Sequence, residues 1–137
     1  MNNRVLDEFN RYYGEKNSNL RCSALLIALN KIIYENHFNQ QSFCAETFLS
    51  KHVYDNITCY RSENYQFKTL AAFFIAANVP LNEAENLFRE AGYYLNHSMM
   101  HSVIRFALEK HLTLYEADEL LFEKTGKHFF TFQKNNS

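Results

Sequence analysis

The sequence predicts an all-α fold of about seven helices, and three observations carry this expectation. Apolar residues recur at helical spacing along most of the chain. Glycines, the one proline and pairs of residues with capping-box spacing fall between these apolar stripes, where helices would end and begin. Only HFFTF near the end has any longer alternation of apolar and polar residues, and one such segment cannot form a sheet.

The first helix is expected at residues 3–13, because an apolar stripe there is followed by Gly14. The second would start from an N-cap among Asn17, Ser18 and Asn19, three residues whose side chains favour that position. Its stripe is the broadest of this half of the chain and predicts a well-buried helix. The stripe consists of Ala24, Leu25, Ala28, Leu29, Ile32 and Ile33.

Two short helices are expected next, at residues 41–48 and 50–59, with Leu49 between them. Residues 67–78 are then apolar on most of their circumference and predict an interior helix. Val79 and Pro80 would end it, since proline restricts the residue that precedes it.

The second half of the chain contains the clearest signals for helix boundaries. Asn82 with Glu85 has the spacing of a capping box and predicts a helix that Gly92 ends. A further helix is expected at residues 98–111, and a last one starts at a second capping box and ends at a glycine. The residues of that last helix's boundaries are Thr113, Glu116 and Gly126. All three glycines are thus placed at helix ends, and the charged run EADELLFEK is interpreted as a solvated helix face.

Length and composition favour one domain over residues 1–137. The net charge of −1 provides no basic field for nucleic acid, so any such contact would be local. The beginning of the chain lacks the pattern of a secretory signal, and no apolar run approaches the length of a membrane span. We therefore expect a soluble, cytoplasmic protein without membrane contact. Cys22, Cys44 and Cys59 are expected to be buried, reduced thiols.

The order of elements resembles the lambda-repressor-like, Xre-type helix-turn-helix domain. Two short helices around a tight turn are followed by an apolar helix and then by a capped one. The run TLAAFFIAANVPLNEAENLFREAGYYLN is similar to a segment of small bacterial and phage members, and VIRFALEKH and ADELLF also fit. The resemblance covers residues 20–130 and is most specific at 81–95. It implies a helix-turn-helix core at residues 20–95 and a C-terminal helical extension at 96–137.

The resemblance also implies roles for single residues. Cys44 stands where the first helix of the pair usually has a small residue, Leu49 is the apolar residue of the turn, and Tyr54 and Ile57 anchor the second helix. The polar edge of that second helix would enter the major groove of DNA. The residues expected at the DNA are Ser50, Lys51, His52, Asn56 and Arg61.

The local charge leaves a second function open. Between residues 40 and 68, three cations are matched by three carboxylates, among them Asp55 on the polar edge itself. Tight binding to DNA recruits about 6 to 10 phosphate contacts in well-studied cases, and one copy offers two or three. A homodimer would double that number. The alternative is a protein-binding module, such as a phage or mobile-element inhibitor that docks on a host nucleoprotein complex.

No catalytic, metal or cofactor site is expected. His97 and His101 lie four residues apart, but no carboxylate or cysteine nearby in the sequence completes a metal site. Cys44 or Cys59 with His52 is the only pair that suggests a nucleophile, and the glycine loop of an oxyanion hole is lacking. Phosphate-binding and hydrolase motifs are absent from the sequence. We therefore expect a protein that is not an enzyme.

Two groups of aromatic residues have more than one interpretation. Five tyrosines near Arg61 or in turns could stack on single-stranded nucleic acid, but core packing with the hydroxyl at the rim is favoured. These are Tyr54, Tyr60, Tyr65, Tyr93 and Tyr94. The tail contains Phe129, Phe130 and Phe132, which either fold back onto the core or contact a second protein. Folding back is the favoured arrangement.

Overall fold

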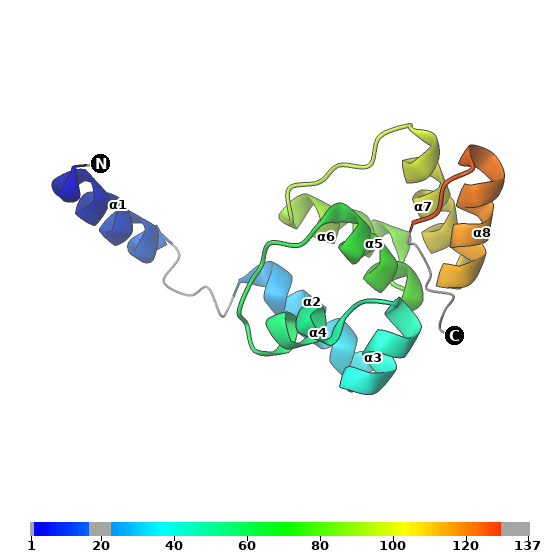
Figure 1. The fold of residues 1–137 in the computed structure, drawn as a ribbon, viewed down its shortest axis with the longest axis horizontal. Helices are drawn as coiled ribbons and strands as arrows, with labels where there is room; N and C mark the ends of the chain where they lie inside the picture. Colours follow the sequence, from blue (N-terminus) through cyan, green and yellow to red (C-terminus); the bar gives the residue numbers. More distant parts are fainter. Residues whose placement is uncertain (1, 17–22, 130–137) are drawn as a thin grey trace.

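A computed structural model describes residues 2–16 and 23–129, which form eight helices and no strand. The all-α prediction is confirmed, with one helix more than the expected seven. The helices follow the chain in the order shown in Figure 1, and none of them has the length and apolar character of a membrane span. They are α1 (Asn3–Lys16), α2 (Ala24–Glu35), α3 (Gln40–Thr47), α4 (Lys51–Thr58), α5 (Phe67–Ala76), α6 (Leu81–Glu90), α7 (Met99–Lys110) and α8 (Leu114–Thr125).

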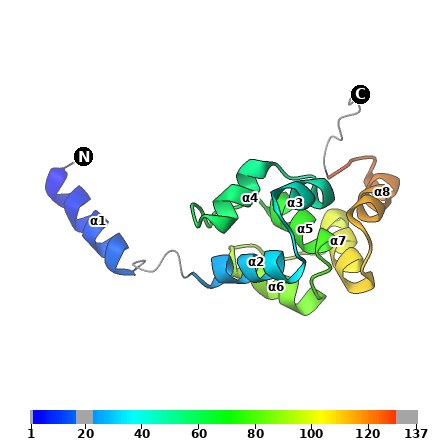
Figure 2. The same ribbon diagram turned by 90° about the horizontal axis from the view of Figure 1, so that it is seen from below.

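The interior helix predicted at residues 67–78 is confirmed as α5. Every side chain from Leu70 to Ile75 is buried, so this helix is covered around its whole circumference. It contacts α3 on one side and α6, α7 and α8 on the others, and both ribbon views place it in the middle of the helices (Figures 1 and 2). Buried residues of α2 to α8 belong to one continuous hydrophobic core, which the C-terminal extension shares.

Phenylalanine rings fill much of this core. Phe43 of α3 is fully buried, and its ring centroid lies 5.3 Å from those of both Tyr54 and Phe73. Phe88 of α6 lies 5.1 Å from Phe74 in an edge-to-face arrangement. Aromatic pairs at such distances stabilise a core beyond the area that they bury. These contacts join α3, α4, α5 and α6 and explain the high phenylalanine content of the chain.

Two of the three glycines end helices as expected, and the third does not. Gly92 and Gly126 do end α6 and α8 with positive φ angles of 92° and 76°. The prediction for Gly14 is wrong, because α1 continues through it to Lys16. Five other helices end on residues that are not glycine and yet adopt the left-handed conformation. These residues are His37, Phe48, Tyr60, Asn78 and His111.

Four of these five ends share one hydrogen-bonding pattern, in which the residue after the left-handed one donates its N–H to a carbonyl five residues earlier. After α2 the donor is Phe38, after α5 it is Val79, and after α7 it is Leu112. All three are apolar and pack on the core. Burial of the apolar residue offsets the cost of the left-handed residue before it.

Helix starts confirm one capping box and contradict the other. Thr113 and Glu116 form the predicted box at α8, with N···O distances of 3.0 and 2.9 Å. The box predicted at Asn82 is wrong, because α6 already begins at Leu81 directly after Pro80. A box that was not predicted, Asn39 with Ser42, starts α3.

The start of α2 is capped by Ser23, whose hydroxyl accepts from the N–H of Leu26. The predicted caps Asn17, Ser18 and Asn19 lie outside the described residues.

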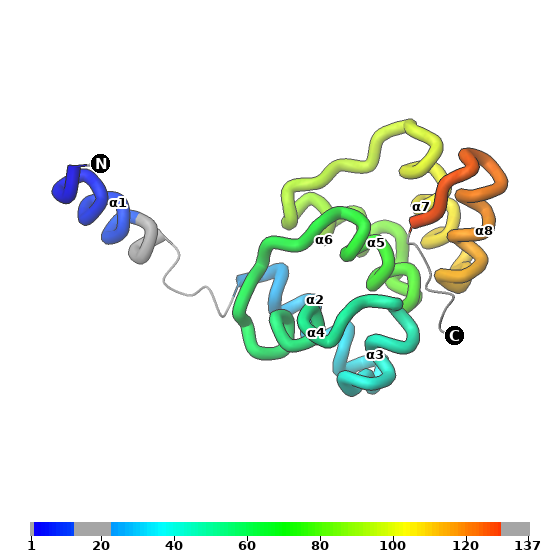
Figure 3. The backbone as a smooth tube through the Cα atoms, viewed as in Figure 1, coloured from blue at the N-terminus to red at the C-terminus, as the bar shows by residue number. Residues whose placement is uncertain are grey.

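The end of the described chain is fixed to α8 by a buried carboxylate. Asp118 is 3% exposed and accepts hydrogen bonds from the Phe129 N–H and from Nδ1 of His128, both at 2.6 Å. Phe129 is itself buried at 5% exposure. The interpretation of EADELLFEK as a solvated face is therefore wrong at Asp118, which faces the interior. Figure 3 shows the chain returning along α8 after the helix ends.

Candidate nucleic-acid interface

The turn between α3 and α4 is built from a buried threonine and a buried leucine. The hydroxyl of Thr47 donates to the carbonyl of Phe43 at 2.7 Å and accepts from the N–H of Leu49 at 3.1 Å. Thr47 is fully buried, and Leu49 is 9% exposed, as expected for the apolar turn residue. Phe48 between them has a φ of 60°, which reverses the chain. As a result, α3 and α4 are two separate helices that pack against each other.

One face of α4 is fixed to the body. Ile57 is 1% exposed, and Tyr54 is half-buried with its ring against Phe43, so both expected anchors are confirmed. Asn30 of α2 adds a polar link, because its side-chain amide donates to the carbonyl of Leu26 at 2.9 Å and to that of Ile57 at 3.1 Å. This amide joins the end of α4 to the middle of α2. The polar edge of α4 is therefore held in a defined orientation.

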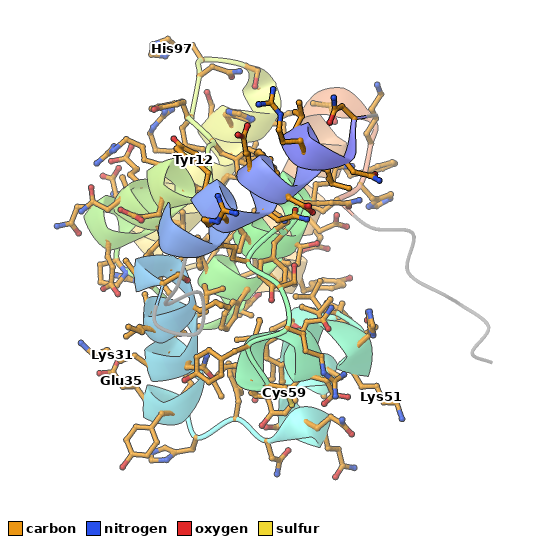
Figure 4. All side chains as sticks on the ribbon, turned by 90° about the vertical axis from the view of Figure 1, so that its left-hand side faces the viewer. Tyr12, Lys31, Glu35, Lys51, Cys59 and His97 are labelled. Atoms are coloured by element: carbon orange, nitrogen blue, oxygen red, sulfur yellow. The ribbon has the colours of Figure 1, made fainter. Side chains whose placement is uncertain are left out.

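The first turn of α4 presents the expected DNA-contacting residues to the outside. Ser50, Lys51 and His52 are all exposed, and Figure 4 shows Lys51 pointing away from the body. The hydroxyl of Ser50 also caps the helix, since it accepts from the N–H of Val53. Asn56, one turn further along, is half-buried.

Arg61 is exposed but does not join this cluster. It follows α4 at the opposite end from Ser50, and its N–H donates to the carbonyl of Asn56 at 2.9 Å. Eight helical residues span about 12 Å, so Arg61 and Lys51 lie near opposite ends of α4. Two cations at this separation would meet different phosphates.

Gln40 belongs to this surface although it was not among the expected residues. Its side-chain amide donates to Oδ1 of Asp55 at 3.1 Å, which links the first residue of α3 to the middle of α4. The capping box at Asn39 sets the start of α3 and thereby the position of Gln40. The signal for this pair was weak in the sequence, because the two residues lie fifteen positions apart. The contact keeps a carboxylate on the edge that would face DNA.

The charges of this region remain balanced in the folded protein. Lys51, Arg61 and Lys68 are exposed, and so is Glu46 on α3. Within the described part of the chain, no ion pair joins these cations to carboxylates. Each cation is available to a phosphate, while Asp55 and Glu46 oppose one. The electrostatic attraction of a single copy for DNA is correspondingly small.

His97 and His101 do not form a metal site. His97 is exposed and points outward at the edge of the molecule (Figure 4). His101 stacks on Phe67 at 4.5 Å, and its Nδ1 accepts from the N–H of Asn96 at 2.9 Å. Burial and the neighbouring Arg105 lower the pKa of His101, which is consistent with a neutral ring that accepts a hydrogen bond. Among the described residues, no group of histidine, cysteine and acidic side chains has the arrangement of a metal site.

The cysteines differ from the expectation of buried thiols. Cys59 is exposed at the end of α4, and Cys44 is half-buried against the core. Cys22 lies outside the described residues. His52 sits in the first turn of α4 and Cys59 just after the last, so the helix separates this pair of candidate catalytic groups.

Four of the five tyrosines considered for a stacking platform belong to the core instead. Tyr65 is 9% exposed, its hydroxyl donates to the Ser62 carbonyl at 2.7 Å, and burial raises its pKa to about 12. The hydroxyl of Tyr93 donates to the carbonyl of Tyr65 at 2.6 Å. Tyr54 and Tyr60 pack on the core as well. Of these five tyrosines, Tyr94, at 71% exposure, is the one that is open to solvent.

Phe129 follows the folding-back arrangement that was expected for the tail. Phe130 and Phe132 lie outside the described residues, so their expected contact with a protein stays a prediction.

Comparisons with family models, with curated proteins and with solved structures gave no match to this chain.

Proposed function

We propose that this protein is a DNA-binding transcriptional regulator of the helix-turn-helix type, that it acts in the cytoplasm as a homodimer, and that it is not an enzyme. The observation that carries the proposal is the first turn of α4. Its three consecutive polar residues, Ser50 to His52, are exposed, while the opposite face of the helix is anchored by Ile57 and Asn30. A helix held in this way can enter the major groove end-on.

The side chains suggest separate tasks at the DNA. Lys51 can bind a phosphate or the acceptor edge of guanine, and Asn56 can make the paired hydrogen bonds that recognise adenine. Arg61 would contact the backbone at the far end of α4. Asp55 opposes the phosphates and, through Gln40, is held in place to do so. Two copies are needed for a useful number of phosphate contacts.

A binding titration of the chain with its own upstream sequence tests this proposal. Fluorescence anisotropy at low and moderate salt should show binding at about 1 µM protein or below. Lys51→Ala should weaken binding to all sequences and reduce the salt dependence, whereas Asn56→Ala should relax the preference for one base. Asp55→Asn should strengthen binding, because it removes a charge of the same sign as the phosphates.

Lys124→Ala provides the matched control, because this exposed lysine lies at the end of α8 and away from α4. Its affinity should equal that of the wild type. Absence of binding in both salts, or equal effects of Lys51→Ala and Lys124→Ala, would refute the proposed interface.

A second candidate function is that of a protein-binding module, such as an inhibitor of a host nucleoprotein complex. The balanced charge around α4 supports it, and so do large exposed side chains of the C-terminal extension. Phe106 on α7 and Tyr115 on α8 are 46% and 61% exposed. A pull-down from host lysate that recovers no stoichiometric partner would count against this function.

A further inference from the structure

A cavity of about 400 Å³ lies where α3, α5 and α7 end and α8 begins. Glu46 and Phe48 line it from the end of α3, Asn78 from the end of α5 and His111 from the end of α7. Tyr115 lines it from the first turn of α8. The four elements can be followed in Figure 1. The volume falls within the range of about 300 to 1,000 Å³ that is typical of small-molecule sites.

The backbone around this cavity favours positive charge. Phe48, Asn78 and His111 are all left-handed, with φ angles of 60°, 56° and 57°, and each stands at the end of a different helix. The carbonyl end of a helix carries a partial negative charge of about half a unit, so three such ends favour a cation nearby. The start of α8 has the opposite sign, but its capping box holds the carboxylate of Glu116 there.

The side chains around the cavity have the same preference. The exposed carboxylate of Glu46 lines the cavity, and no lysine or arginine of the described residues does so. Tyr115 is exposed and presents an aromatic ring, and positively charged groups are attracted to the face of such a ring. Phe48 adds a second ring to the wall and has another contact in the chain as well. Aromatic rings beside a carboxylate are suited to an organic ammonium ion.

Other classes of ligand fit this cavity less well. An anion would meet the carboxylate of Glu46 and three carbonyl ends of the same sign. A metal ion needs several ligand atoms close together, and no such group of histidine, cysteine and acidic side chains occurs among the described residues. Part of the lining is apolar, from the buried residues Ile75 and Leu114, and it suits the carbon groups of an organic cation.

We propose that this cavity binds a small organic cation, of the class of free alkylammonium and quaternary ammonium compounds. The ammonium group lies between the carboxylate of Glu46 and the ring of Tyr115, and its carbon groups lie against Ile75 and Leu114. A ligand in this position contacts both α3, in the half that carries α4, and α8 of the C-terminal extension. The inference goes beyond the proposed function and does not depend on it.

Titration of the isotope-labelled full chain with choline chloride, followed by two-dimensional NMR, tests the proposal. Choline should bind with a dissociation constant of about 1 mM or below, as for other ligands of few atoms. It should shift the backbone amide signals of residues 46–48 and 111–115, which surround the cavity. The titration is made at about pH 8, because His111 in the wall would oppose a cation if it were protonated.

Two matched probes separate the effect of charge from those of shape and salt. Neohexyl alcohol has the shape of choline, with carbon in place of the charged nitrogen, and should bind at least tenfold more weakly. Sodium chloride at the same concentrations should not produce the amide shifts, because the bare ion cannot fill the cavity or contact both of its walls.

Substitutions locate the site. Glu46→Gln should weaken choline binding about tenfold, because it removes the counter-charge and keeps the shape of the side chain. Tyr115→Leu should weaken it similarly, whereas Tyr115→Phe keeps the ring and should bind like the wild type. Glu123→Gln is the matched control, since this exposed carboxylate lies in the last turn of α8 and away from the cavity. The thermal midpoint without choline should be equal in all these proteins, because residues 46, 115 and 123 are exposed.

Three results would overturn the proposal. Absence of the amide shifts at about 10 mM choline would show that the cavity does not bind an organic cation. Equal binding of neohexyl alcohol and choline would show that the cavity selects shape and not charge. Equal choline affinity of Glu46→Gln and Glu123→Gln would place the binding elsewhere. The outcome is the same whether or not the chain binds DNA, so the two proposals stand or fall separately.

Discussion

In each half of the body a polar side chain that is half-buried or buried links separate segments, and the chemistry of the two links differs. In the half that carries α4, Asn30 links two helices with a neutral amide that donates to the carbonyls of Leu26 and Ile57. In the C-terminal half, the carboxylate of Asp118 accepts from the chain that follows α8. Asn30 is half-buried, whereas Asp118 is almost fully buried.

This difference indicates where the fold is sensitive to charge. A neutral hydrogen bond contributes about 1 kcal/mol, whereas a buried carboxylate costs several kcal/mol when its partners are removed. The half with the proposed DNA surface therefore depends mostly on apolar packing. The C-terminal half also contains the buried carboxylate of Asp118, whose ring partner, His128, is 46% exposed in its side chain.

The largest effect is expected from Asp118→Ala. The substitution leaves the buried N–H of Phe129 without its acceptor and frees the phenylalanine from the core, at a cost of about 3 kcal/mol in the free energy of unfolding. Urea denaturation followed by circular dichroism measures it. Asp118→Asn keeps an acceptor for the same N–H and should cost about half as much. Equal stability of Asp118→Ala and the wild type would show that the carboxylate does not hold the C-terminal half.

Apolar spacing predicted much of this fold from the sequence. The interior helix α5 was expected, because its burial is encoded in the local pattern of apolar residues. The burial of Leu49 and Ile57 and the exposure of Ser50, Lys51 and His52 were expected from the resemblance to helix-turn-helix domains, and the structure agrees with them at these residues.

Features that depend on distant partners were not predictable in this way. Asp118 sits among charged residues of one helix, and only the return of the chain eleven residues later reveals its role. The pair of Gln40 and Asp55 joins two helices and leaves no periodic signal. The left-handed conformation of His37 and His111 was not expected, because neither is a glycine, whereas burial of the following apolar residue is what favours the turn.

A smaller effect is expected from Asn30→Ala. It removes the hydrogen bond between α2 and α4 and should cost about 1 kcal/mol in the free energy of unfolding. Asn36→Ala is the matched control, since its amide donates only within α2, to the carbonyl of Ile32 at 2.9 Å. If the link between helices positions α4, DNA affinity should fall in Asn30→Ala and not in Asn36→Ala. Equal DNA affinity of the two variants would contradict that positioning role.

The protonation of His101 should make the free energy of unfolding depend on pH. Its pKa in the folded protein is lowered by burial and by Arg105, so the unfolded chain binds this proton more readily. The stabilisation by the neutral ring is complete above the unfolded pKa of about 6.5 and is lost as the pH falls through the lower folded value. Denaturation curves between about pH 7.5 and pH 5 should therefore show a loss of stability that His101→Gln lacks.

The exposed His97, four residues earlier, provides the control for this pH profile. The variant His97→Gln should keep the profile of the wild type. If both variants flatten the profile equally, the contact between His101 and Asn96 is not its origin.

The smallest effects are expected at a feature that the two halves share, a histidine in the left-handed conformation at the end of a helix. His37 ends α2 and His111 ends α7, both exposed and both with a φ of 57°. Glycine adopts this conformation without the steric cost of a side chain but loses more conformational entropy on folding, so His37→Gly and His111→Gly should each stabilise the protein by about 0.5 kcal/mol. Glu109→Gly, two residues earlier with helical geometry, should instead destabilise it by about 1 kcal/mol.

Because the strain is local to each backbone turn, the two histidine variants should give equal shifts in urea denaturation, and their double variant should show the sum. A gain in only one half would mean that the histidine side chain of the other half contributes a contact of its own, and the two halves would then differ in how their helices end as well as in how they are tied together.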